Sequence, residues 1–391
     1  MAQLNITLNL EEITEAVLNS DMDQMMKSLT VTIFNAYMQA EREEFINAKR
    51  YERTDDRKDY RNGSYKRNFK TKVGTVELDV PRTRSGEFDT KLFDKYQRMD
   101  KAFVAVLTEM YINGVSTRRI KKVVETLCGE GVSKSFVSSV NKNLDPAVFE
   151  FKGRSLTHTN FRYVYVDAMY IKVRENHRSV SKGVYIAQGI NDDNRREIIG
   201  FMIADNESEE NWKNFFLDLK ARGLTKPTLI ISDAHKGLKS AISNQFLGTT
   251  WQRCTVHFLR NILAHFPKKD CSHERSLLKR IFNADSQQRA RELKFEFVEY
   301  VSGNEKYDKA VNTLEEGFED AIPYLLEPTP YRVSLKTTNS LERLNREIRR
   351  REKVVGLFPN IEAAERLIGS VLLDLHEYWE TCPHKFFNNI V

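Results

Sequence analysis

The chain has 391 residues, of which 40% are hydrophobic and 30% are charged, and its net charge is +6. This length and composition predict two or three globular domains of about 150 residues each, with real hydrophobic cores. No apolar run approaches the about 18 residues of a membrane helix, and neither a leader segment nor a cysteine pattern indicates export, so we expect a cytoplasmic protein without a membrane partner.

The first region, residues 1–48, is expected to be helical. Apolar side chains recur at near-helical spacing from Ile13 to Tyr37, and many charged residues lie outside that stripe. We interpret this region as a helix that packs against the rest of the chain or forms a dimer contact.

Residues 49–98 carry the basic excess of the chain and are predicted to contain a β-hairpin. Ten Lys or Arg and four Asp or Glu fall between residues 49 and 72, which equals the net excess of the whole chain. Alternation of side chains around a turn near Val73 places lysines on one face of the hairpin. These lysines are Lys66, Lys70 and Lys72. They are candidate phosphate ligands, unless Glu77 and Asp79 on the return strand neutralise them and leave an ordinary solvated surface.

Residues 99–155 follow the pattern of a helix-turn-helix DNA-binding domain. Ser116 or Thr117 caps one amphipathic helix, the segment CGEGVS forms a turn, and Ser133 caps a second helix. The outward side chains of the second helix are small and polar or basic, which suits base edges and phosphates in a major groove. These candidate DNA contacts are Lys134, Ser135, Ser138, Ser139 and Lys142. A small helical bundle that does not bind DNA would show much the same pattern.

From Arg162 onwards the pattern changes to that of an α/β fold. Three strand-like runs follow one another, and helices and strands then alternate up to the run TTWQRC. This order of elements is that of the ribonuclease H-like fold. We therefore expect the first part of a ribonuclease H-like catalytic core over residues 156–257, preceded by a mostly helical DNA-binding region with a β-hairpin.

Two acids in this core are candidates for a metal site. Asp167 lies in the middle of the run RYVYVDAMYIKV, where an isolated buried carboxylate would cost several kcal/mol. The expected fold places its first and fourth strands side by side, which would bring Asp167 close to Asp233. Two carboxylates at such a distance repel each other unless a cation lies between them, and Mg²⁺ prefers oxygen ligands. Each acid alone has a simpler explanation, a buried salt bridge for Asp167 and a helix cap for Asp233, but the pair favours a metal site.

Glu342 is the candidate third acid. With Asn339 as the N-cap, Glu342 would form a capping box, and this role is compatible with metal binding only if the start of the helix faces the site. The same helix is rich in arginines, which next to an acidic metal site are candidate clamps on DNA phosphates. These arginines are Arg343, Arg346, Arg349, Arg350 and Arg351.

A Cys-x-x-His pair, Cys254 and His257, lies between the second and third acids. Together with Cys271 and His273 it could supply four zinc ligands, but the Cys-x-His spacing is too tight for a usual finger, so zinc is not expected. We instead expect a group of residues packed at a strand end beside the active site. Its members are Trp251, Cys254 and His257, with His235 nearby. His235 either contacts the scissile phosphate or caps its helix.

Six sequence motifs occur in a fixed order over nearly the whole chain: YRNGSYKR, VPRTRSGEF, VYVDAMYIKV, ISDAHKGL, WQRCTVHFLRN and TTNSLERLNREIRRR. This series resembles the Mutator-type transposases of bacterial insertion sequences, members of the Asp-Asp-Glu superfamily. The resemblance implies that Asp167, Asp233 and Glu342 form the catalytic and metal-binding triad. It also implies a helical insertion over residues 258–336, followed by C-terminal helices of the core over residues 337–391.

The resemblance further implies phosphoryl transfer with two Mg²⁺ ions, for which Mn²⁺ is expected to substitute. Water frees a 3′-hydroxyl at an element end, and that hydroxyl then attacks another phosphodiester. The expected partners are the double-stranded terminal repeats and target DNA, bound by a homodimer or higher oligomer at the bacterial nucleoid. A transposase-derived regulator would not need three acids, and a ribonuclease H-like nuclease or junction resolvase would have little use for the long amino-terminal half.

Overall fold

The computed structural model describes residues 22–387, apart from 53, 72–73, 94–99, 129–132, 268, 270 and 383–384. The chain divides into two units, residues 1–143 and residues 144–391. Each unit is described by itself. No helix in the described part of the chain combines the length and apolar character needed to cross a bilayer.

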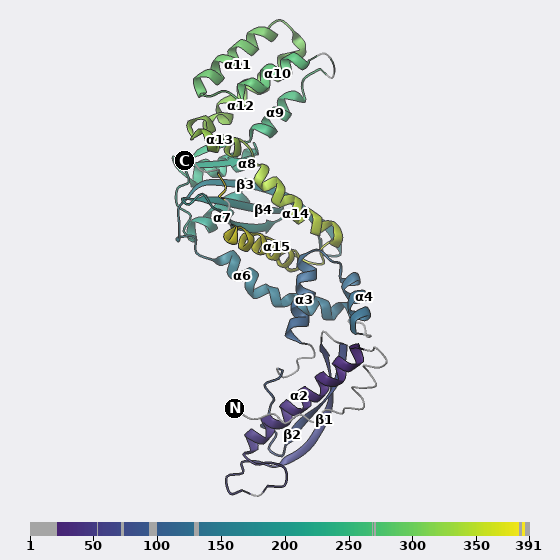
Figure 1. Ribbon diagram of the computed structural model, residues 1–391. Helices are drawn as coiled ribbons and strands as arrows, with labels where there is room; N and C mark the ends of the chain where they lie inside the picture. Colours follow the sequence, from purple (N-terminus) through teal and green to yellow (C-terminus); the bar gives the residue numbers. More distant parts are fainter. Residues whose placement is uncertain are drawn as a thin grey trace. The chain divides into compact units, whose positions relative to one another are not determined.

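In the first unit, a long helix packs against a two-stranded hairpin (Figure 1). These elements are α2 (Met22–Ile46), β1 (Arg61–Thr71) and β2 (Gly74–Thr83), and the strands pair antiparallel. Phe69 and Val76 face each other across the pair and join a core that includes Met38 of α2. The hairpin expected between residues 49 and 98 is therefore present, and alternate residues of β1 and β2 pack on α2.

Three further helices of the first unit form a separate cluster. They are α3 (Lys101–Ile112), α4 (Thr117–Cys128) and α5 (Lys134–Asn141), followed by the 3₁₀ turn η1 (Lys142–Leu144). Ser116 Oγ accepts a hydrogen bond from the Arg119 amide, and Ser133 Oγ accepts one from the Phe136 amide, so both expected serine caps are formed. The buried core of the cluster comprises Phe103, Leu107, Ile120, Val124, Val137 and Val140.

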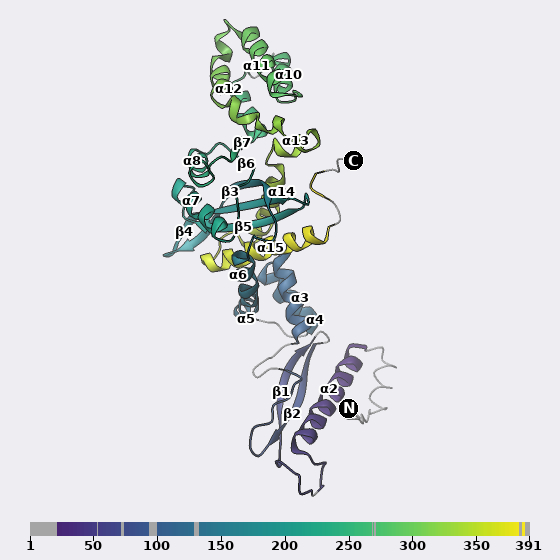
Figure 2. The ribbon, with the colours of Figure 1, turned by 90° about the vertical axis from the view of Figure 1, so that its left-hand side faces the viewer.

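The second unit is built around a mixed five-stranded sheet with the order β5-β4-β3-β6-β7 (Figures 1 and 2). The strands are β3 (Phe161–Glu175), β4 (Arg178–Asn191), β5 (Arg196–Ala204), β6 (Leu229–Ser232) and β7 (Thr250–Arg253). The first three strands form an antiparallel meander, whereas β6 pairs parallel to β3 and β7 pairs parallel to β6. The central strand is therefore β3.

Two helices cover one face of this sheet. They are α7 (Glu209–Ala221), which begins at the Ser208 cap, and α8 (Lys236–Gln245). Trp212, Phe215 and Phe216 of α7 are almost fully buried against alternate residues of β3 and β4. This large apolar core holds α7 and α8 on the sheet, because burial of a large apolar side chain stabilises the packed state by about 1.5–3 kcal/mol.

The opposite face carries the two C-terminal helices, as Figure 2 shows. They are α14 (Asn339–Val355), which packs on β3, and α15 (Ile361–Thr381), which packs on β5 and on α6 (Asp145–Gly153). Arg366 of α15 forms a two-pronged ion pair with Asp145, at 2.5 and 2.9 Å. The first unit ends at residue 143, so α6 belongs to the second unit.

A helical segment interrupts the second unit between β7 and α14. It contains α9 (Thr255–Leu263), α10 (Ser272–Ile281), α11 (Gln287–Val301), α12 (Asp308–Ala321) and α13 (Thr329–Leu335), with the 3₁₀ turns η2 (Glu305–Tyr307) and η3 (Pro323–Leu326). The two ends of the segment are held together at its root, where the amide and the hydroxyl of Thr255 both donate to the Lys336 carbonyl at 2.8 Å. His257 and Glu342 each follow this root by only a few residues.

Candidate active site

Asp167 lies halfway along β3 and is only partly exposed. Its side chain faces α14: Oδ2 accepts a hydrogen bond from Asn345 Nδ2 at 2.6 Å, and Oδ1 accepts one from the Ala168 amide at 2.9 Å. Burial, followed by the nearby charge of Asp233, raises the pKa of Asp167 to about 7. Among the described residues no lysine or arginine forms an ion pair with Asp167, so the salt bridge considered from the sequence is not formed.

Asp233 directly follows β6, the parallel neighbour of β3. Tyr165 pairs with Ile231, and because each acid comes two residues later, Asp167 and Asp233 lie level with each other in the sheet. The expected adjacency of the first and fourth strands is therefore confirmed. Asp233 does not cap the next helix, since α8 begins at Lys236 and the preceding residue occupies the N-cap position.

Glu342 belongs to the first turn of α14, but the capping box expected with Asn339 is wrong. The helix begins at Asn339 itself, Thr338 occupies the N-cap position, and no side chain caps the helix. Both potential capping groups have other neighbours: the Thr338 hydroxyl donates to Cys254 Sγ at 3.4 Å, and Glu342 Oε1 lies 3.5 Å from His257 Nε2. The start of α14 therefore faces the acids, which leaves the carboxylate of Glu342 directed at the site.

His257 connects the second and third acids. It lies in the first turn of α9, with Nδ1 against Asp233 Oδ1 and Nε2 near Glu342. The contact with Asp233, and then the one with Cys254, raise the pKa of His257 to about 10, so the ring is an imidazolium at neutral pH. A positive ring between two carboxylates offsets part of the repulsion among the acids.

Cys254 and Trp251 anchor the end of β7 beneath this histidine. The Cys254 amide donates to the Ser232 carbonyl at 2.8 Å, and the Trp251 indole donates to Ser232 Oγ at 2.8 Å. Burial by itself would raise the pKa of the fully buried Cys254 thiol, but hydrogen bonds with His257 and Thr338 outweigh burial and lower that pKa. Because Ser232 immediately precedes Asp233, these contacts fix the strand end that carries the second acid.

The donor atoms of this site fit a divalent cation. Potential ligand atoms of Asp233, Cys254 and His257 lie within 4.8 Å of one another. As an imidazolium, however, His257 has no free nitrogen lone pair, so it serves as a hydrogen-bond donor to Asp233 and not as a metal ligand. Asp233 Oδ1 is buried and lies against His257 Nδ1, and a carboxylate oxygen keeps a second lone pair with which it can bind a cation. Asp167 and Glu342 add carboxylate oxygens around the same point. Three carboxylates around one point provide the oxygen ligands that a hard ion such as Mg²⁺ prefers.

The other two residues of the possible zinc set lie elsewhere, at α10. The Cys271 thiol donates to the Pro267 carbonyl at 3.0 Å and accepts from Arg275 Nε at 3.0 Å, while the His273 ring contacts Tyr300. Neither residue belongs to the group of potential ligands at Asp233. The four-residue zinc arrangement is therefore not assembled within the described residues.

Of the two roles considered for His235, side-chain capping of its helix is not formed. It occupies the N-cap position of α8 without a side-chain capping bond, and its Nδ1 lies 3.5 Å from Glu207 Oε1. The ring is partly exposed and lies two residues from Asp233. A contact between His235 and a scissile phosphate remains a prediction.

The candidate DNA contacts of the first unit are exposed to different extents. Lys66 forms an exposed ion pair with Glu77, as the alternative interpretation of the hairpin expected, and Lys70 is partly buried. Water screens such an exposed pair, so it contributes little to stability and a phosphate would replace the carboxylate at little cost. Ser138, Ser139 and Lys142 are exposed on and just after α5. Lys72, and the side chains of Lys134 and Ser135, lie outside the described part of the chain.

The arginines of α14 divide into two groups. Arg343, Arg346 and Arg350 are exposed. Arg351 is 5% exposed and pairs with Glu347, so its inclusion in a phosphate clamp is wrong, because helical spacing alone does not reveal which face a neighbouring element covers. Arg349 donates to the Tyr170 carbonyl at 2.6 Å and pairs with Glu352.

Asn345 is the site residue that the sequence interpretation missed. It follows Glu342 by three residues and therefore lies on the same side of α14, where it donates to Asp167. This spacing from Glu342 is the sequence feature that indicates a position at the site. It is weak, because an asparagine on an arginine-rich helix otherwise looks like a surface residue.

Comparisons with known proteins agree over almost the whole length of the chain. A family model described as "Transposase, Mutator family" matches residues 1–382. The chain is 49% identical over 388 residues, 99% of each protein, to the transposase for insertion sequence element IS256 in transposon Tn4001 of Staphylococcus aureus. It is 41% identical to the transposase for element ISRM5 of Rhizobium meliloti, with 90% of this chain and 88% of that protein covered.

Two more distant similarities complete the comparison. The chain is 35% identical to the transposase for element IS1081 of Mycobacterium tuberculosis, over 94% of this chain and 89% of that protein. Among solved structures, a chain from the simian T-cell lymphotropic virus intasome in complex with a PP2A regulatory subunit matches with 11% identity and a TM-score of 0.18, covering 52% of this chain and 68% of that one. A score that low does not indicate a shared fold.

Proposed function

Because the chain belongs to the Mutator family of transposases, we propose that it binds the terminal inverted repeats of an insertion sequence and catalyses Mg²⁺-dependent DNA strand cleavage and strand transfer. In this proposal Asp167, Asp233 and Glu342 are the catalytic, metal-binding residues of an Asp-Asp-Glu enzyme. The core around β3 to β7 is proposed to be ribonuclease H-like, which is supported by the strand order and by helices on both faces of the sheet.

The observation that carries the proposal is the convergence of three acids from three separate elements. Asp167 and Asp233 lie level on neighbouring parallel strands, and Glu342 reaches the same point from α14 through its contact with His257. Carboxylates placed this close to one another repel each other and destabilise the protein, unless a bound cation neutralises their charge. Their grouping in a transposase therefore favours a catalytic role over a structural one.

The chain's own residues hold and orient the reacting groups. Mg²⁺ held by Asp167, Asp233 and Glu342 would activate the attacking oxygen and stabilise the leaving oxygen of the phosphodiester. Asn345 fixes the rotamer of Asp167, and the tie between Cys254 and Ser232 fixes the strand end before Asp233. Water attacks first and frees a 3′-hydroxyl, which the same residues then direct at a second phosphodiester.

DNA binding is proposed for both units. In the first unit, the helix cluster α3 to α5 presents Ser138, Ser139 and Lys142 to solvent, as a recognition helix requires. In the second unit, the exposed arginines of α14 follow Glu342 along the same helix and would contact phosphates next to the scissile bond. A homodimer or higher oligomer on DNA would bring two element ends together.

Cleavage assays on the element's own terminal repeat test the triad. The duplex is taken from the DNA that flanks the reading frame and is incubated with full-length protein and Mg²⁺ or Mn²⁺. Asp167→Asn, Asp233→Asn and Glu342→Gln should each fold and bind the repeat but lose cleavage by orders of magnitude.

The matched control is Glu362→Gln. Glu362, like Glu342, is an acid in the first turn of a C-terminal helix, but it is exposed on α15. It should retain full activity. A Glu342→Gln enzyme that cleaves at the wild-type rate would place the third acid elsewhere and contradict the assignment.

A further inference from the structure

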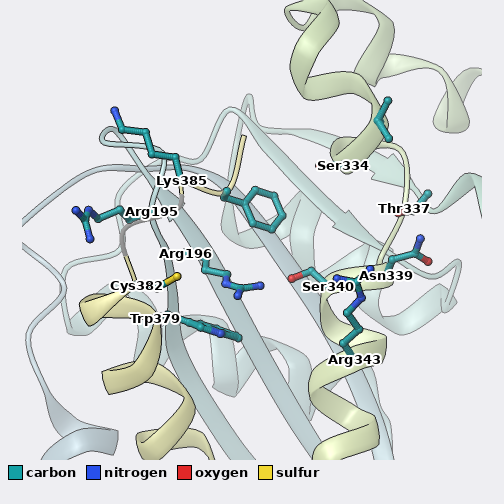
Figure 3. Close-up of a pocket in the computed structure, with 12 residues that line it drawn as sticks. Arg195, Arg196, Ser334, Thr337, Asn339, Ser340, Arg343, Trp379, Cys382 and Lys385 are labelled. Atoms are coloured by element: carbon teal, nitrogen blue, oxygen red, sulfur yellow. The ribbon is translucent and has the colours of Figure 1, made fainter. Parts of the chain in front are cut away.

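A basic pocket opens beside the start of α14, between that helix, β5 and the end of α15 (Figure 3). Its volume is about 330 Å³, near the lower end of the range of small-molecule sites. A cavity of this size accepts a single nucleotide unit and excludes a duplex. Arg196 and Arg343 reach towards each other across the pocket, whereas Arg195 and Lys385 stand at its rim with their end groups directed away from the centre.

Among the described residues, four cations and no acid line the pocket. Arg195 donates to the Glu380 carbonyl at 3.1 Å, but neither Arg196 nor Arg343 forms an ion pair within the described residues. Burial, followed by repulsion from the like charge of Arg343, lowers the pKa of Arg196. Two converging, uncompensated guanidinium groups repel each other, and an anion between them would remove that repulsion.

The polar groups around these arginines favour a phosphate. Asn339 and Ser340 lie in the first turn of α14, where backbone amides and the helix dipole attract negative charge. Arginine forks match the oxygens of a phosphate in two-pronged contacts. The Trp379 ring is covered on one face by Arg196, whose guanidinium lies 4.2 Å from the ring centre, so that face is not available to stack a base.

The pocket is adjacent to the proposed catalytic residues. Arg343 immediately follows Glu342, so their side chains leave α14 about 100° apart and at nearly the same height. A DNA strand carries a phosphate every about 3.4 Å of helix axis. A strand whose scissile phosphate lies at Glu342 therefore has a neighbouring phosphate within reach of the pocket.

From these observations we propose that the pocket binds the backbone phosphate of a nucleotide next to the scissile bond, and so positions the cleaved DNA strand. The proposal rests on the proposed function and adds a subsite to it. Arg196 and Arg343 contact the phosphate, while Lys385 and Arg195 attract the strand at the rim. A free phosphate offers the same chemistry, and the experiment below distinguishes it from DNA.

Neutral phosphates placed in the cleavage substrate test this subsite. A series of terminal-repeat duplexes carries one methylphosphonate each, at successive positions on either side of the scissile bond. At one flanking position the neutral group should slow wild-type cleavage about 10- to 100-fold, the effect of losing a hydrogen bond between charged groups. The same methylphosphonate should slow Arg196→Gln by a several-fold smaller factor than the wild type, because one of the two arginines that contact that phosphate is already absent.

Two further variants make the result independent of folding. Lys385 is exposed on the rim, so Lys385→Gln should fold normally and weaken the same positional effect severalfold. Lys213 is exposed on α7, over the other face of the sheet, and Lys213→Gln should keep the complete wild-type interference pattern. Thermal melting of each protein with and without inorganic phosphate forms the second arm.

The possible outcomes separate the proposals. Equal slowing of the wild type, Arg196→Gln and Lys385→Gln at every position would overturn the DNA subsite while leaving the proposed function intact. The same equality, with inorganic phosphate raising the melting temperature of the wild type but not of Arg196→Gln, would assign the pocket to a free anion instead. A wild type that cleaves none of the duplexes would overturn the proposed function together with the subsite.

Discussion

Replacing Asn345 by leucine should weaken metal binding at the three acids without unfolding the protein. Asn345 Nδ2 donates to Asp167 Oδ2 at 2.6 Å, and this bond both favours the charged carboxylate and fixes its orientation. Hydrogen bonds to charged groups are worth about 1.5–3 kcal/mol, and partners of metal ligands typically change affinity 10- to 100-fold. We therefore expect Asn345→Leu to raise the Mg²⁺ and Mn²⁺ dissociation constants by about that factor.

The stability of the metal-free protein should change much less. In the wild type, Asn345 Oδ1 is buried without a hydrogen-bond partner, which destabilises the folded protein by about 1–3 kcal/mol. The leucine removes this unsatisfied oxygen. The lost bond to Asp167 and the removed penalty nearly cancel. The free energy of unfolding without metal should consequently shift by less than about 1 kcal/mol.

Calorimetric titration with Mn²⁺, and the Mg²⁺ dependence of terminal-repeat cleavage, measure the effect on binding. The control is Asn211→Leu, which removes a helical asparagine on α7 whose side chain donates to the Asn206 carbonyl at 3.0 Å and not to any of the three acids. It should bind metal as the wild type does. Metal affinity of Asn345→Leu within twofold of the wild-type value would refute the assigned role of this hydrogen bond.

Three other perturbations have defined outcomes. Gly317→Ala should destabilise the protein by about 1–3 kcal/mol in urea titrations, because an added Cβ would lie 2.8 Å from the buried Phe258 ring. This clash outweighs the gain of about 1 kcal/mol in helix propensity. Stability equal to or greater than that of the wild type would contradict the packing argument. Burial, and then the nearby Arg154, lower the pKa of His376 to about 4, so from about pH 6.5 downwards the unfolded chain binds a proton that the folded chain does not. His376→Gln should therefore lose about 2 kcal/mol less stability than the wild type between pH 7 and pH 5, and an equal loss would show that this ring titrates normally. In full-length protein, Lys142→Gln should reduce the salt dependence of terminal-repeat binding by about one unit of log–log slope, whereas an unchanged slope would remove it from the DNA contacts.

The sequence predicts those parts of the site that follow from strand order. Asp167 and Asp233 could be paired because each lies at a defined point of a strand, and a parallel neighbour fixes their relative height. The meander and the hairpin followed from the alternation of buried and exposed residues. In these elements the local pattern and the tertiary packing agree.

The features that local patterns could not predict depend on contacts between distant segments. Asn339 has the sequence of an N-cap, but the contact of Thr338 with Cys254 sets the start of α14 instead. Arg351 looks like its exposed neighbours until Glu347 and the adjoining elements bury it. The pocket around Arg196 combines residues of β5, α13, α14, α15 and the C-terminal segment, and no local pattern predicts that these segments meet.

The hydrogen bonds between Thr255 and Lys336 have a consequence for changes in the length of the segment between them. They join two positions separated by 81 residues, so the helices between them form a closed loop whose ends are already fixed. Doubling or halving such a loop changes its closure free energy by only about 0.6 kcal/mol. Changes in the length of the turns within this segment therefore cost little closure free energy, provided that α9, which carries His257, and the contact between Thr255 and Lys336 keep their places.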